Sequence, residues 1–395
     1  MSNSGKMENR KDIKEIKNME YDYASLVKEQ KQYINRVLKK DKLRIPMLFC
    51  SGKLRGLKKQ YSLHTESDNL QQEFNDLSDI IDGIDRNKWY RFWNKCLHEL
   101  QDMLFERKYK NPIGRIRTEI KKTGKNYLVI ASIVKNEGRY IREWVAYYKL
   151  MKVDHIYLFD NGSTDSIRDI LKKEIKEGYV TLIPFRGVNA QLPMYRLTAK
   201  LLKNQCRWVA YIDADEFILP QKGTLRDYLK TKENYPGIGI NWIVYGPSGH
   251  VDRPEGLVME NYLQTFQDRD NVLNLRIKTI ANPKEIYDVS SPHYCTLKNS
   301  RYAVDEDGEE ITTKWMYVSG SGAAFTGENK TKRIRINHYW TRSEQDLREK
   351  CDRGYAAGSF SPDYQNIMSR LAYPQMMDYA IEPYVAEVKR LLEEE

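Results

Sequence analysis

The sequence predicts an α/β fold in which a mainly parallel, twisted sheet is flanked by helices and preceded by a helical appendage. From residue 127 onward, short apolar runs rich in β-branched residues alternate with segments of helical spacing. Continuous apolar runs suit strands that are buried on both faces, and strand–helix–strand alternation favours parallel pairing with right-handed crossovers. Residues 1–125 hold few strand-like runs and many charged residues at helical spacings.

Four strands are predicted in the first half of the sheet, at residues 127–134, 155–160, 179–184 and 207–213. The helices between them are marked by apolar faces at three-to-four-residue intervals. They are expected near residues 141–148, 167–175 and 192–206, and Gly178 suits the C-terminal cap of the second.

The appendage contains one clear helical pattern, over residues 87–105. Its apolar stripe is expected to pack into a core, and it comprises Trp89, Phe92, Trp93, Cys96, Leu97, Leu100 and Leu104. Residues 116–126 are polar and basic, which suggests a connector. The chain is therefore divided into a helical appendage at 1–125 and an α/β domain at 126–395.

The composition fits a globular protein with a proper core, since hydrophobic residues make up 41% of the 395 residues and charged residues 30%. The net charge of +10 is compatible with nucleic acid, an anionic membrane face or phosphorylated substrates. Five scattered cysteines favour a reducing compartment. The N-terminus lacks the apolar segment of a signal peptide, and the longest apolar run is too short to span a bilayer. We expect a cytoplasmic protein, with the basic N-terminal region able to contact anionic lipid at the inner membrane face.

The first chemical motif is the acidic string at residues 213–216, which follows the fourth predicted strand. Asp213 and Asp215 stand two residues apart, so they share one side of an extended chain. In an open α/β sheet, ligands bind beyond the carboxyl ends of the strands. Two close carboxylates there favour a divalent cation that bridges a diphosphate. A solvated acidic turn explains the same string.

Two further polar loops follow the first two predicted strands. Asp160 and Asp165 enclose an Asn-Gly turn, from which they could accept hydrogen bonds of a ribose or base. Lys135, Asn136 and Glu137 follow the first strand and are candidates for contacting a nucleotide. Each loop alone is also explained by ordinary turn and capping roles. Three polar loops on one rim of a sheet are what a nucleotide pocket requires.

An ordered set of motifs resembles the GT-A fold glycosyltransferases, and more narrowly glycosyltransferase family 92 and its relatives in the family 2-like group. The resemblance covers residues 127–354 and rests on VIASIVKNEGRYIREWVAYYKLMKVDHIYLFDNGSTD, YIDADEFI, INWIVYGPSGH, RPEGLVMENY, KTIANP, SPHYC and INHYWTRS. Residues 1–125 resemble no family that we recognise.

The resemblance implies inverting transfer from a UDP-sugar, with Mn²⁺ or Mg²⁺ as cofactor. We further expect a glycan or lipid-linked acceptor and a role in surface-polysaccharide synthesis. Asp213 and Asp215 match the motif that binds metal and diphosphate. Asp160 and Asp165 match positions near the nucleoside, and Lys278, in KTIANP, is expected to contact the donor. Pro247 stands where the family pattern has serine, which leaves acceptor specificity open.

Inversion requires a general base, and a carboxylate is the usual choice. Asp252, Glu255 and Glu260 are the candidates, of which Glu260 is favoured by the resemblance, although a structural salt bridge explains it as well. His250 is a candidate acceptor-facing residue. The resemblance further implies that His338, at the end of a predicted strand, returns to the metal as a ligand.

Two other function classes are compatible with parts of the sequence. A basic nucleic-acid-binding protein would fit the net charge, but basic and acidic residues are interspersed and no nucleic-acid-binding motif is present. The chain could also be an inactive, glycosyltransferase-like scaffold, but the presence of both Asp213 and Asp215 argues against this interpretation. No nucleic-acid partner is therefore expected.

Overall fold

A computed structural model describes Lys31 and residues 88–187, 189–289, 291–300, 302–311, 325–353 and 363–393. The chain divides into two compact units. The larger unit comprises Gln101–Ile311 and Thr326–Glu395 and carries the sheet. The smaller unit comprises Met1–Leu100 and Thr312–Phe325. Most of the predicted appendage therefore lies outside the described residues.

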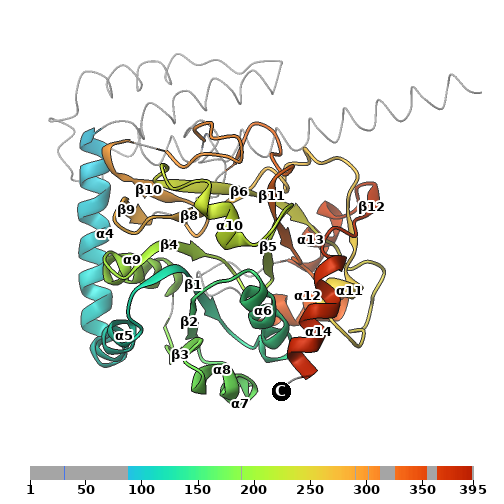
Figure 1. The fold of residues 1–395 in the computed structure, drawn as a ribbon, viewed down its shortest axis with the longest axis horizontal. Helices are drawn as coiled ribbons and strands as arrows, with labels where there is room; N and C mark the ends of the chain where they lie inside the picture. Colours follow the sequence, from blue (N-terminus) through green and yellow to red (C-terminus); the bar gives the residue numbers. More distant parts are fainter. Residues whose placement is uncertain are drawn as a thin grey trace, which may run out of the picture. The chain divides into compact units, whose positions relative to one another are not determined.

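The elements alternate as predicted from residue 126 onward (Figure 1). The first half contains α4 (Lys88–Lys108), α5 (Lys110–Lys122), β1 (Asn126–Val134), α6 (Gly138–Leu150), β2 (His155–Asp160), α7 (Ile167–Ile170), α8 (Lys172–Lys176), β3 (Val180–Pro184), α9 (Gln191–Leu202), β4 (Cys206–Tyr211), β5 (Glu216–Pro220) and α10 (Leu225–Lys230). The second half contains β6 (Gly237–Val244), α11 (Val258–Asn261), β7 (Gln264–Phe266), β8 (Ile277–Ala281), β9 (Ile286–Val289), β10 (Cys295–Leu297), η3 (Lys298–Ser300), β11 (Ile334–His338), α12 (Glu344–Arg353), α13 (Tyr364–Arg370), β12 (Gln375–Met377), η5 (Glu382–Tyr384) and α14 (Val385–Glu393).

The main sheet has eight strands in the order β3-β2-β1-β4-β8-β6-β11-β5. Strands β3, β2, β1 and β4 are mutually parallel, as predicted. Strand β8 is antiparallel to both of its neighbours, and β11 is parallel to β6. Strands β6 and β11 therefore run in the same direction as β1–β4. This mixed, mainly parallel sheet confirms the predicted fold class, and it brings the carboxyl ends of β1, β2, β4 and β11 to one edge.

Helix α6 fastens the edge strand β5 through its aromatic side chains. Trp144 Nε1 and Tyr148 Oη donate to the carbonyl of Glu216 at 2.9 and 3.0 Å, and Tyr147 Oη donates to that of Ile218 at 2.8 Å. All three side chains are fully buried. A buried Tyr or Trp needs a partner for its polar end, and the outward carbonyls of an edge strand supply one. Two of the 28 tyrosines thus hold the edge strand in place. Helix α14 packs beside α6 (Figure 1).

The predicted connector at residues 116–126 is wrong for most of its length, because α5 continues to Lys122. Ile113, Ile116 and Ile120 are buried along one face of this helix, which packs on α9 and β3. Three isoleucines at helical spacing form a narrow apolar stripe that the surrounding lysines and arginines obscure.

The helix expected over residues 87–105 is confirmed as α4, although its apolar stripe is not buried throughout. Leu100 and Leu104 are 51% and 60% exposed. The side chains of Trp89, Phe92, Trp93 and Leu97 lie outside the described part of the chain. Among the described residues, no helix is both long and apolar enough to cross a membrane.

Residues 101–125 are expected to be required by the sheet that follows them. Asp102 is buried and accepts from Arg196 Nε of α9 at 2.8 Å, and the three isoleucines of α5 cover α9 and β3. A chain that begins at residue 126 should therefore unfold at a lower temperature than one that begins at residue 101, because Arg196 is left buried without its carboxylate. Thermal unfolding of both chains followed by circular dichroism measures this. Equal melting temperatures would show that α5 contributes nothing to the core.

Candidate functional site

The loops after β1 and β2 are hydrogen-bonded to each other at the carboxyl edge of the sheet. The Asn136 amide donates to Ser163 Oγ at 3.0 Å, and the Thr164 amide donates to Asn136 Oδ1 at 2.7 Å. Asn136 has a φ of 55°, a left-handed conformation that asparagine tolerates better than most residues. Asp160 Oδ1 accepts from the Ser163 amide at 2.8 Å within its own loop. Two of the predicted nucleotide-binding residues therefore also build the rim.

Asp165 joins this rim to the start of α6. Its Oδ2 accepts from the Gly138 amide at 2.7 Å, while its Oδ1 is buried without a hydrogen-bond partner in the described structure. A Cβ at Gly138 would lie 2.8 Å from Asp165 Oδ2, so glycine is required for this close approach. Asp165 thus links the loop after β2 to the first residue of α6.

Glu137 is held by two arginines that the sequence did not single out. Arg342 Nη1 lies 2.8 Å from Glu137 Oε2, and Arg353 Nη2 lies 2.5 Å from Oε1. Arg353 also donates to the carbonyl of Lys135 at 2.6 Å. Arg342 lies over the ring of Tyr140, 4.0 Å from its centroid. Through these two ion pairs, Glu137 links the loop after β1 to the segment after β11.

Asp213 lies between β4 and β5, where two side chains from other elements hold it. Lys278 Nζ of β8 is 2.7 Å from Asp213 Oδ2, and Gln191 Nε2 of α9 donates to Oδ1 at 3.2 Å. Lys278 is also 3.4 Å from Glu216 Oε2, which accepts from the Asp213 amide at 2.8 Å. Burial raises the pKa of Glu216 to about 8. The predicted residues Asp213 and Lys278 are thus brought into direct contact.

Asp215 and His338 face each other across the end of β11. Asp215 Oδ1 lies 3.7 Å from His338 Nε2, and the Tyr339 amide donates to the Asp215 carbonyl at 2.9 Å. Burial opposes ionisation of Asp215, but the Lys350 ammonium group outweighs it and holds the pKa of the Asp215 carboxyl well below the usual range. Burial lowers the pKa of His338, which keeps the imidazole in the neutral form that binds metals.

The donor set at this point fits a divalent cation only in part. Asp215 Oδ1 and His338 Nε2 offer an oxygen and a nitrogen ligand, a combination that suits Mn²⁺. His338 Nδ1 is buried without a hydrogen-bond partner among the described residues. Lys350 Nζ lies 2.8 Å from the other oxygen of Asp215. In the described part of the chain, no group of three or more His, Cys, Asp and Glu side chains is arranged to hold a metal. A divalent cation at this point would have two protein ligands.

The candidate bases lie on the segment between β6 and β7. Asp252 is exposed, and Glu255 is exposed with Arg139 at 3.6 Å. Glu260 Oε1 lies 2.5 Å from Lys389 of α14, and its Oε2 accepts from the Leu257 amide at 3.2 Å. His250 Nε2 is 3.1 Å from the carbonyl of Asn261. These contacts give Glu260 and His250 structural partners, and the identity of the base stays a prediction.

Glu143 of α6 binds the same segment, between β6 and β7, through two hydrogen bonds. Its Oε2 accepts from the Val258 amide at 2.8 Å and its Oε1 from the Met259 amide at 2.9 Å. Burial raises the pKa of Glu143 to about 7, against the two amide hydrogen bonds. The first turn of α11 is thereby fixed by a side chain that lies more than a hundred residues earlier in the sequence.

The sequence reasoning missed the basic side chains that follow β11, namely Arg342, Lys350 and Arg353. Each contacts a site carboxylate or a loop carbonyl. Their spacing offered a signal, since Lys350 and Arg353 stand three residues apart and thus share one face of α12.

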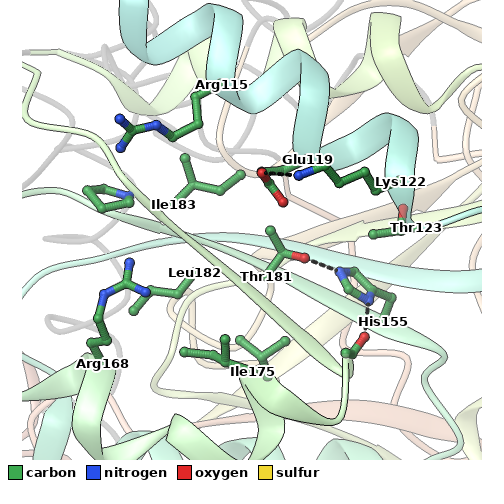
Figure 2. Close-up of a pocket in the computed structure, with 13 residues that line it drawn as sticks. Arg115, Glu119, Lys122, Thr123, His155, Arg168, Ile175, Thr181, Leu182 and Ile183 are labelled. Carbon is green, nitrogen blue, oxygen red and sulfur yellow. Dashed lines mark hydrogen bonds and ion pairs between the residues drawn. The ribbon is translucent and has the colours of Figure 1, made fainter.

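A separate groove of about 610 Å³ runs along β3, between α5 and the α7–α8 segment (Figure 2). Arg115 and Glu119 lie on one side of it and Arg168 on the other. His155 bonds to Thr181 Oγ1 at 2.8 Å in its wall. None of the residues that line this groove belongs to the predicted site.

A model of glycosyltransferase family 92 matches residues 130–351, which is more than half of the chain. A glycosyltransferase family 92 protein of Oryza sativa subsp. japonica is 29% identical over 140 residues, covering 34% of this chain and 24% of the relative. Another of Ricinus communis is 26% identical over 199 residues, covering 48% and 35%. This chain thus spans about a quarter to a third of the length of these curated relatives.

Solved structures give weaker likenesses. Residues 1–349 of S. aureus TarS in complex with UDP match with a TM-score of 0.30 and 16% identity, over 56% of this chain and 62% of that one. Glucosyl-3-phosphoglycerate synthase from Mycobacterium tuberculosis, in complex with phosphoglyceric acid, matches with a TM-score of 0.22 and 17% identity, over 35% and 50%. At these scores the likenesses carry no inference about function.

Proposed function

Because this chain belongs to glycosyltransferase family 92, we propose that it transfers a sugar from a UDP-sugar to a hydroxyl group of a glycan or lipid-linked acceptor, with inversion. The observation that supports this proposal best is the meeting of Asp213, Asp215 and His338 at the carboxyl edge of the sheet. That edge is where α/β sheets bind nucleotides.

Each predicted group has a task in this proposal. Asp160, Asp165 and the 135–137 loop form the side of the rim that would receive the nucleoside, since their loops are joined there. Asp215 and His338 would hold Mn²⁺ or Mg²⁺, which supplies positive charge for the diphosphate leaving group. Asp213, which the motif also offers as a metal ligand, has its Oδ2 paired with Lys278 Nζ at 2.7 Å. We therefore propose Asp215 and His338 as the two protein ligands. Asp252, Glu255 and Glu260 remain the proposed sources of the general base.

We also propose a cytoplasmic setting, peripheral to the inner face of a membrane, and a role in surface-polysaccharide synthesis. The net charge of +10 supports contact with anionic lipid.

The direct test is a donor screen that follows UDP release from a set of UDP-sugars with Mn²⁺ present. One donor should be turned over, and UDP with Mn²⁺ should raise the melting temperature, because a ligand that binds only the folded state stabilises it. Oligonucleotides serve as the comparison. Stabilisation by oligonucleotides but not by UDP with Mn²⁺ would favour the nucleic-acid-binding alternative, and UDP binding without turnover of any donor would favour an inactive scaffold.

His338→Ala is expected to weaken Mn²⁺ binding about tenfold to a hundredfold, because one of two protein ligands is lost. High Mn²⁺ should partly restore UDP binding, since Asp215 remains in place. A Mn²⁺ titration followed by electron paramagnetic resonance measures the affinity. An unchanged titration would remove His338 from the proposed metal site.

A further inference from the structure

Lys350 places a positive charge on the carboxylate that is proposed to bind the metal. Its Nζ is 2.8 Å from Asp215 Oδ2 and also donates to the Trp340 carbonyl at 2.8 Å. The Lys350 and Asp215 side chains are only 15% and 13% exposed. A surface ion pair is screened by water and contributes little, but a largely buried pair is screened much less. Asp215 is therefore neutralised by the chain itself.

Lys350 differs from Lys278, the other lysine of the acidic motif. Lys278 projects from the interior of β8, is 1% exposed and contacts both Asp213 and Glu216. Lys350 stands in the last turn of α12 and reaches Asp215 with a flexible four-carbon stem. One lysine is thus fixed within the sheet, whereas the other is able to leave its carboxylate by rotation of its own side chain.

We propose that Lys350 is a built-in counter-ion of Asp215 that must leave this carboxylate when a divalent cation binds, and that its release makes metal and nucleotide bind cooperatively. This inference rests on the proposed donor and metal site. The ammonium lies within 4 Å of the carboxylate that a cation would use, and two cations on one carboxylate repel each other.

The release of Lys350 costs less when a diphosphate is present. An ammonium ion is a compact charge that binds phosphate oxygens well, so the released side chain gains a new partner on the nucleotide. Metal alone has to overcome the Lys350–Asp215 pair without this gain. By thermodynamic linkage, UDP then strengthens Mn²⁺ binding and Mn²⁺ strengthens UDP binding by the same factor.

The experiment compares wild type with Lys350→Met, which keeps the length of the stem but removes the charge. Lys149→Met is the matched control, because Lys149 Nζ makes an ion pair with Glu177 at 3.1 Å on the far end of α6. Mn²⁺ affinity is measured by electron paramagnetic resonance with and without UDP, and UDP affinity by calorimetry. Lys350→Met should bind Mn²⁺ alone about tenfold more tightly than wild type, and the strengthening by UDP should fall by a similar factor. Lys149→Met should match wild type.

Lys350→Arg keeps the positive charge and should bind Mn²⁺ about as tightly as wild type. If Lys350→Met does not fold, Lys350→Gln replaces it and should show the same increase in Mn²⁺ affinity. Unchanged or weaker Mn²⁺ binding in the neutral variants would overturn the counter-ion role, as would the absence of any Mn²⁺ binding. If UDP binds wild type in that case, the proposed donor site stands. If wild type binds Mn²⁺ but not UDP, the proposed function fails, while the comparison of Mn²⁺ affinities still decides the role of Lys350.

Discussion

Asp215→Ala is expected to reduce sugar transfer by at least about a thousandfold while the protein remains folded. Asp215 is one of the two proposed metal ligands, and it lies in a loop between two strands rather than inside the sheet. Its loss removes the oxygen ligand and leaves Lys350 facing the diphosphate alone. Because the main-chain bond from the Tyr339 amide to the carbonyl of residue 215 does not depend on the side chain, the strand ends should stay in place.

UDP release with the preferred donor measures the activity, and circular dichroism with a thermal melt checks the fold. Asp252→Ala serves as a comparison within the predicted set, because Asp252 is exposed and is only one of three proposed bases. Near-normal turnover in Asp215→Ala would remove the metal-site assignment, whatever the effect of Asp252→Ala.

Asp378→Ala is expected to destabilise the protein by about 3–5 kcal/mol at pH 7, because it leaves a buried arginine without its carboxylate. Arg335 of β11 makes two contacts with Asp378, Nη1 to Oδ2 at 2.9 Å and Nη2 to Oδ1 at 2.7 Å. Arg269 adds a third contact at 2.7 Å. The Arg335–Asp378 ion pair holds the segment after β12 against β11, the strand that carries His338. Urea unfolding of wild type and Asp378→Ala measures the difference in stability.

The destabilisation caused by Asp378→Ala should become smaller at acidic pH. Burial opposes ionisation of Asp378, but Arg335 outweighs it and holds the pKa of Asp378 below its usual range. The stabilisation is therefore complete above the ordinary pKa of an aspartate, about 4, and is lost as the pH falls towards the lower folded value. Asp307→Ala is the control, since Asp307 also contacts two basic residues, Lys330 and Arg333, but is 40% exposed. Its loss should cost less than about 1 kcal/mol. Equal destabilisation by both variants, or a difference independent of pH, would contradict this account.

The fold was predictable where local patterns decide it. The strands β1–β4 and the helices between them follow apolar runs and turn residues that can be recognised in the sequence, and Ser343 with Asp346 caps α12 as its spacing indicates. The course of α5 was not predictable, because its three isoleucines bury against elements that lie far along the chain.

For the candidate site, the sequence predicts only which strand ends lie together at one edge of the sheet. Parallel strands place their carboxyl ends on one edge, so the approach of Asp213 and His338 to a common rim follows from the strand directions. The ion pairs of Glu137 and Asp215 with Arg342, Arg353 and Lys350 bridge segments about 135 to 215 residues apart. A single sequence gives no means of pairing charges over such separations, since each residue looks like an ordinary surface charge.

The two amide hydrogen bonds that Glu143 receives from Val258 and Met259 fasten the segment of the candidate bases to α6. Amide protons exchange with solvent only when their hydrogen bonds open, at a rate set by the free energy of that opening. In deuterium exchange, the Val258 and Met259 amides should therefore be protected together with the interior of α6. The amides of exposed neighbouring residues, such as Val251 and Asp252, should exchange early. The two ends of one short segment would then belong to different cooperative units of the molecule.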